Sequence, residues 1–268
     1  MKKMFLIFTT LLLSIILISC SASIKEDEIH VGVAFYPMKD ILLLIEDDLK
    51  EEGYKLKIQE FSDYQVPNNL LDKKELDANM IQHEYFLNEF NKANKTTLKI
   101  KMNIYHATFA LYSSLYKSLD DIPDGSEITL PNDATNLTRA FYLLDQSGLI
   151  KLKDKTKNIL TEDDILENPK NLTFNEKVPL TSLSNKYIET KLAVMYPTYA
   201  LNLELEGDSE RLYIEKQDEI TTNYAISLAT RSDNFNSDKI EALTKALNQE
   251  KVRNFLIENY SWASSPAF

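Results

Sequence analysis

The alternation of apolar and polar positions predicts strands and helices that follow one another along the chain. Short buried or alternating runs predict strands, which we expect over residues 29–35, 54–58, 98–105, 108–112, 127–130, 172–175, 193–196 and 224–230. Apolar residues at helical spacing predict helices over residues 37–52, 67–75, 83–93, 135–147 and 238–260. Strands that alternate with helices of this length indicate an α/β protein with largely parallel sheets.

The beginning of the chain carries a targeting signal. Lys2 and Lys3 precede an apolar run over residues 5–18, which is shorter than the roughly 20 residues that span a bilayer and is typical of a signal peptide. The run ends in LISC, which resembles a bacterial lipobox, so we expect a signal peptide over 1–19 and lipidation of Cys20. The alternative is an ordinary signal peptide or a short anchor with an incidental cysteine.

The expected lipid would anchor the protein to a membrane without spanning it. Residues 20–27 are mostly small or charged and are predicted to form a tether between this anchor and the folded part. We therefore expect an extracytoplasmic lipoprotein on the cell membrane or the outer membrane.

Composition narrows the possible functions. With 44% hydrophobic residues the chain can bury a sizeable core. Its 30 basic and 41 acidic residues give a net charge of -11, which disfavours nucleic acid as a partner. The single cysteine excludes an intramolecular disulfide and a cysteine-cluster metal site.

Local motifs for catalysis are missing from the sequence. It contains no G-x-S-x-G, no P-loop and no H-E-x-x-H, although a spatial Ser–His triad needs no local motif. His83 with Glu84 offers a possible pair of metal ligands, but the spacing to His30 and His106 does not show that they converge. We expect no enzyme activity, no metal and no cofactor, and a hydrolase is the least supported hypothesis.

Five segments carry a family resemblance from about residue 29 to residue 231. They are FSDYQVPN at 61–68, LDANMIQH at 76–83, PNDATNLTR at 131–139, GLIKLK at 148–153 and ENPKNL at 167–172. In this order after a lipobox, they resemble the methionine-binding lipoprotein (NlpA-type) family, the substrate-binding proteins of ABC importers.

The resemblance implies a two-lobed periplasmic-binding-protein fold with a ligand cleft between hinged lobes. Lobe 1 is expected over 28–110 and 222–268, and lobe 2 over 111–221, with crossings near 110–111 and 221–222. The implied partners are an amino acid or short peptide and an ABC permease with its ATPase, and a monomer is expected.

The resemblance also assigns site residues. Tyr64, His83 and Phe86 match positions that hold the ligand's thioether in the family, while Ile81 stands where the family has a phenylalanine. Arg139 is the expected partner of the ligand's carboxylate, which a guanidinium binds bidentately. The alternatives are core packing for the apolar residues and a structural role for the arginine.

Two expected site residues depart from the family pattern. Tyr196 and Ile226 stand where the family has asparagines that would bind the ligand's amino-acid end, and an ammonium left unpaired costs several kcal/mol. The cleft is therefore expected to be more apolar than usual. Methionine remains the first candidate ligand, and a dipeptide or another hydrophobic carboxylate is an alternative. So is a surface lipoprotein that has lost transport and serves adhesion or host interaction.

Overall fold

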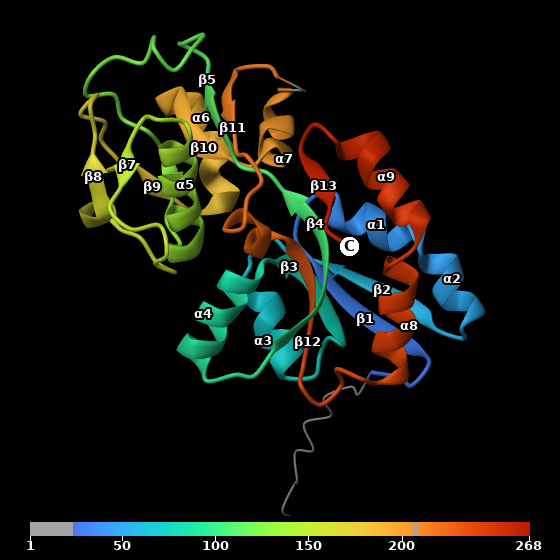
Figure 1. The fold of residues 1–268 in the computed structure, drawn as a ribbon. Coiled ribbons are helices and arrows are strands. Elements are labelled where there is room, and N and C mark those ends of the chain that lie inside the picture. The colour runs from blue at the N-terminus through green and yellow to red at the C-terminus, as the bar shows by residue number, and fades with distance from the viewer. Residues whose placement is uncertain (1–23, 206–207) are drawn as a thin grey trace, which may run out of the picture.

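The computed structural model describes residues 24–205 and 208–268 (Figure 1). The predicted signal peptide, the lipobox and Cys20 lie outside the described residues. Within the described part of the chain, no helix is long and apolar enough to cross a membrane.

A six-stranded sheet forms the larger part of the fold. Its strands, in spatial order, are β13 (Ser264–Pro266), β4 (Lys99–Ala107), β12 (Ile226–Thr230), β3 (Ala78–Gln82), β1 (Glu28–Val33) and β2 (Lys55–Glu60). β1 is parallel to β2 and β3, whereas β12 is antiparallel to both of its neighbours. The prediction of largely parallel sheets was wrong, because β12 returns from the second lobe and enters the sheet in the opposite direction.

The strand β3 was missed from the sequence, although it lies inside this sheet. All five of its residues are buried, so it lacks the alternation of a half-exposed strand. The side-chain amides of its Asn79 and Gln82 are buried and exchange hydrogen bonds with Asn68 of α3 at 2.6–2.8 Å, and Gln82 also donates to Asn79 at 3.1 Å. This amide cluster satisfies the polar groups of the strand that leads into His83.

Six helices pack on the large sheet or beside it. They are α1 (Met38–Leu44), α2 (Glu46–Glu51), α3 (Val66–Asp72), α4 (Glu84–Asn94), α8 (Asp238–Leu247) and α9 (Glu250–Tyr260). The predictions of single helices over 37–52 and 238–260 were wrong, because each is broken into two. At Ile45 the backbone N–H bonds three residues back to Leu42, and Gln249 is extended and caps α9. The buried Ile45 keeps its place in the apolar pattern, so the spacing did not reveal that break.

The second lobe is built around a three-stranded antiparallel sheet. Its central strand is β5 (Ala110–Ser113), flanked by β10 (Leu192–Met195) and β11 (Arg211–Ile214). The remaining elements are β6 (Leu130–Pro131), β7 (Lys151–Leu152), β8 (Ile165–Glu167), β9 (Lys177–Val178), α5 (Ala134–Gln146), α6 (Leu183–Thr190) and α7 (Pro197–Ala200). The predicted strand 172–175 is reduced to a single isolated bridge, in which Thr173 pairs with Glu127.

The chain crosses twice between the two sheets. It leaves the large sheet after β4, at Thr108 and Phe109, and returns between β11 and β12 through the 3-10 helix Thr221–Tyr224. The predicted crossing residues 110–111 open β5, and 221–222 open that 3-10 helix. Figure 1 shows the two lobes on either side of these crossings.

Candidate functional site

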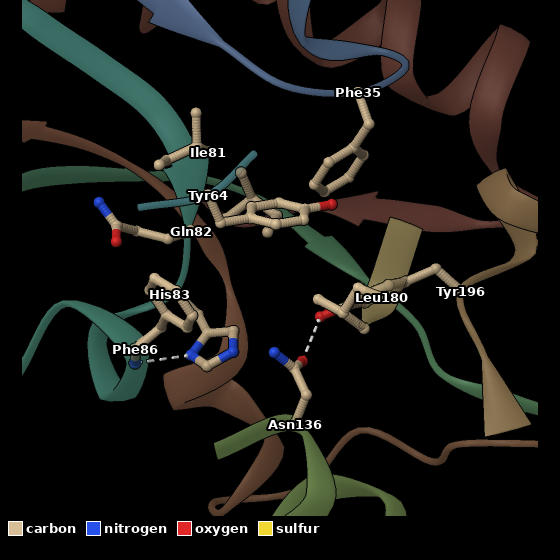
Figure 2. A pocket seen from close by; sticks show the side chains of 10 residues that line it. Phe35, Tyr64, Ile81, Gln82, His83, Phe86, Asn136, Leu180 and Tyr196 are labelled. Carbon is tan, nitrogen blue, oxygen red and sulfur yellow. Dashed lines mark hydrogen bonds between the residues drawn. The ribbon is translucent and has the colours of Figure 1, made fainter. Parts of the chain in front are cut away.

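A cavity lies where the two lobes meet, and Figure 2 shows Phe35, Tyr64, His83, Phe86, Asn136 and Leu180 around it, while the amide of Gln82 points away. The lining residues are Phe35, Tyr64, Ile81, Gln82, His83, Phe86, Asn136, Leu180, Tyr196 and Ile226. Six of the seven ligand-binding residues predicted from the sequence are among them, and only Arg139 is not. The free volume is about 10 Å³, which admits about one water molecule.

Aromatic side chains from the two lobes fill the cleft. The Phe35 ring lies 5.8 Å from that of Tyr64, 6.0 Å from that of Tyr196 and 5.9 Å from that of Tyr199, measured between centroids. The hydroxyl of Tyr64, from the first lobe, contacts the hydroxyl of Tyr199, from the second. These contacts hold the lobes together over the cavity, so the structure is in a closed form.

His83 caps α4 and presents one ring nitrogen to the cavity. Its Nδ1 accepts a hydrogen bond from the backbone N–H of Phe86 at 3.2 Å, which places the proton on Nε2. Nε2 is buried, and no described residue bonds to it. Burial, followed by the positive charge of Arg139, lowers the pKa of His83 to about 3. At neutral pH the imidazole is therefore uncharged and offers one unused N–H donor.

Arg139, in the second turn of α5, lies behind the cavity and pairs with a glutamate. Its Nε donates to Glu215 Oε1 at 2.9 Å and its Nη2 to Glu215 Oε2 at 2.5 Å, which is a bidentate ion pair. Nη2 also donates to the carbonyl of Ala107 at 2.6 Å, and Nη1 donates to the hydroxyl of Tyr196 at 3.1 Å. Of five N–H donors, the described surroundings engage four and leave one on Nη1.

The guanidinium of Arg139 stays charged despite its burial. Burial alone would lower its pKa, but the carboxylate of Glu215 raises it above the ordinary value. The rings of Phe109, Tyr196 and Tyr224 lie 4.8–5.4 Å from its central carbon and add cation–π attraction. The ion pair has no net charge, so the cavity sees a neutralised arginine.

Tyr196 and Ile226, the two departures from the family pattern, both line the cavity. The Tyr196 hydroxyl accepts from Arg139 and donates to Asn136 Oδ1 at 3.0 Å, while its ring packs 4.3 Å from that of Phe109. Ile226, the first residue of β12, is buried and contributes only apolar surface. At these two positions the cleft is therefore lined by an aromatic ring and an aliphatic side chain in place of amides.

Several lining residues were not assigned from the sequence. Asn136 lies in the segment PNDATNLTR at 131–139. Asp133 orients its amide, and Asp133 Oδ1 also accepts a hydrogen bond from the backbone N–H of Asn136 at 2.9 Å. Glu215 had no local signal except a lone charge after an apolar strand. Phe35 follows β1, Gln82 ends β3 and Leu180 opens a 3-10 helix, and only the fold brings these three residues together.

The described residues contain no group of three or more histidine, cysteine, aspartate and glutamate side chains that could hold a metal ion. What the described residues of the cleft do offer is hydrogen-bond donors, aromatic surface and the Arg139–Glu215 ion pair behind it. These groups can bind and orient a small molecule.

A cleft between two lobes, closed around a small cavity and crossed twice by the chain, defines the class of substrate-binding proteins. Within that class, the chain belongs to the NlpA lipoprotein family, whose sequence profile matches residues 29–268. Members of this family are binding proteins rather than enzymes.

Two relatives and one solved structure illustrate the similarity. The methionine-binding lipoprotein MetQ of Bacillus subtilis is 34% identical over 99% of both chains. The D-methionine-binding lipoprotein MetQ of Escherichia coli K12 is 32% identical over 93% of this chain and 92% of its own. A nutrient binding protein from Burkholderia cenocepacia, solved bound to methionine, matches with a TM-score of 0.82 and 31% identity, covering 90% of this chain and all of that one. These relatives do not favour the alternative of a surface lipoprotein for adhesion.

Proposed function

We propose that this protein is the extracytoplasmic binding lipoprotein of an ABC importer, anchored through Cys20. It binds a free amino acid or a short peptide in the cleft and delivers this ligand to the permease and its ATPase. The observation that carries the proposal is the cavity itself, which six predicted ligand residues line from both lobes. The relatives named for methionine binding support the same class of ligand.

Closure of the lobes is the proposed working motion. The lobes comprise residues 28–110 with 222–268, and residues 111–221, and they turn about the two crossings. A ligand that touches both lobes stabilises the closed form by the difference between its affinities for the two forms. The Tyr64–Tyr199 contact joins the lobes at the cleft, so it separates when the cleft opens.

Arg139 acts in this proposal as the donor for a ligand's acceptor group. Glu215 holds Nε and one N–H of Nη2, so a bidentate grip on these two nitrogens is not available to a ligand. One N–H of Nη1 donates to Tyr196 and the other has no partner among the described residues, so a ligand that displaces the phenol gains both. Arg139→Ala removes these donors and leaves Glu215 buried without its partner.

The proposal is tested by calorimetry on the mature chain with L- and D-methionine, other amino acids and short peptides. A ligand found in this way should compact the protein in small-angle scattering and stimulate the ATPase of a reconstituted permease. Leu180→Ala, which alters the cavity, should weaken binding, while Leu166→Ala on exposed β8 should not. Absence of binding across the whole panel would contradict the proposal.

A further inference from the structure

The hydroxyl of Tyr196 occupies the two polar groups that a free amino acid needs most. A carboxylate requires a donor such as Nη1 of Arg139, and an ammonium requires an acceptor such as Oδ1 of Asn136. The phenol accepts from that donor at 3.1 Å and donates to that acceptor at 3.0 Å. It therefore satisfies, within the chain, the same pair that a zwitterionic headgroup would engage.

The surroundings offer no substitute for these two groups. Glu215 binds the Nε and Nη2 edge of the Arg139 guanidinium, and the side chain of Ile226 contributes neither donor nor acceptor. Asp133 does not line the cavity, and both of its oxygens accept hydrogen bonds from the amide of Asn136. A free amino acid must expel the phenol and pay for its two hydrogen bonds before it gains its own.

The cavity has only about 10 Å³ of free volume in this closed form, so a ligand must part its walls, and the inner part then offers contacts to an uncharged group. The Nε2–H of His83 is buried without a partner and can donate to an acceptor on the ligand. Ile81, Phe86 and Leu180 supply apolar surface around it. An uncharged side chain that carries one acceptor matches this chemistry, because a buried donor gains most from being satisfied.

A groove continues outward from the same cavity. Tyr64, Phe86 and Leu180 line both, and the groove runs on between Ser62 and Asp63 of one lobe and Asn132 and Thr181 of the other, with about 170 Å³ of free volume. It gives the flanking residues of a peptide a place that a free amino acid would leave empty.

We infer that Tyr196 is a specificity-determining residue that stands in for a ligand's zwitterionic headgroup, so that the cleft favours a residue carried in a short peptide over a free amino acid. The inference rests on the proposed function and specifies its ligand class. A peptide-linked residue has amides in place of the ammonium and carboxylate, and it leaves the phenol's two hydrogen bonds intact.

The test compares two probes, L-methionine and N-acetyl-L-methionine amide, by calorimetry on three proteins. The wild type should bind the blocked probe more tightly. Tyr196→Phe, which keeps the ring, should improve L-methionine binding about thirtyfold, the effect of two ordinary hydrogen bonds that no longer compete with the ligand. Tyr196→Asn also frees the volume of the ring and should reverse the order of the two probes.

Tyr187→Phe is the matched control, because Tyr187 is another buried tyrosine with one side-chain hydrogen bond, to Glu210, away from the cavity. It should leave both affinities unchanged. Tighter binding of L-methionine than of the blocked probe by the wild type, or no gain in either Tyr196 variant, would overturn the inference and leave the proposed function standing. No binding of any amino acid or peptide by any of the proteins would overturn both.

Discussion

The ion pair between Arg139 and Glu215 offers the sharpest test of the energetics of this fold. Replacing Glu215 by leucine removes two acceptors from a guanidinium whose side chain is 2% exposed, as Glu215's also is. It also deprives the backbone N–H of Phe109, which donates to Glu215 Oε2 at 3.2 Å. Only the carbonyl of Ala107 and the hydroxyl of Tyr196 then remain as hydrogen-bond partners of the cation.

The expected loss follows from what is left behind. Removing one partner of a buried ion pair costs about 3–5 kcal/mol, because the remaining charge is uncompensated. We expect Glu215→Leu to lose this amount of unfolding free energy. Glu215→Gln keeps a carbonyl acceptor and should lose less, about 1–3 kcal/mol. The double variant Arg139→Met with Glu215→Leu removes both charges and should recover most of the loss.

Urea unfolding followed by circular dichroism measures these differences, and equal m-values show that the variants expose the same surface. The double variant is the decisive comparison, since it separates the cost of an unpaired charge from the cost of lost packing. If it were as unstable as Glu215→Leu alone, or if Glu215→Leu lost less than about 1 kcal/mol, the reasoning from the buried pair would be refuted.

Three further predictions address other parts of the chain. The pKa of His83 is lowered from 6.5 to about 3, so the unfolded chain binds the proton more readily, and stability should fall as the pH drops from 6.5 toward 3. Pulse proteolysis at several pH values should show a flatter dependence for His83→Asn, which can still cap α4, and parallel curves would contradict the prediction. Asp133→Ala removes the cap of α5 and should cost about 1 kcal/mol in thermal unfolding, with no change in melting temperature as the opposing result. Cys20→Ala should release the protein from the membrane fraction and abolish acyl labelling, whereas unchanged partition would count against a lipid anchor.

The local signals in the sequence were enough for much of the fold. Asp133 caps α5 with its side chain, and the helix, predicted over 135–147, ends before Gly148, whose φ is +79°. Strand β3 escaped prediction because it is buried on every side, and the break between α1 and α2 escaped because Ile45 keeps the apolar phase. At α8 and α9 a mark did exist, since the five-residue step from Leu247 to Val252 is out of helical phase.

Some residues of the candidate site could likewise be predicted from the sequence, and others could not. Tyr64, Ile81 and His83 come from motifs whose resemblance located them, and the structure brings them together at one cavity. The partner of Arg139 could not be found from sequence, because Glu215 is 76 residues away and only the return crossing places it there. Whether these residues bind a ligand remains a prediction for the binding experiments.

The position of Arg139 has a mechanical consequence for the proposed closure. Its guanidinium contacts Ala107 and Phe109 where the chain leaves the large sheet, and Glu215 and Tyr224 where it returns, so it lies between the two crossings about which the proposed closure would turn. Groups close to a pivot move little when the arms swing, and groups at the rim move far. The ion pair between Arg139 and Glu215 can therefore stay formed in both the open and the closed form. The hydroxyl contact between Tyr64 and Tyr199, in contrast, would break on opening and reform on closure. Because Tyr196 is hydrogen-bonded to Arg139, a ligand that displaced Tyr196 would act directly on this ion pair.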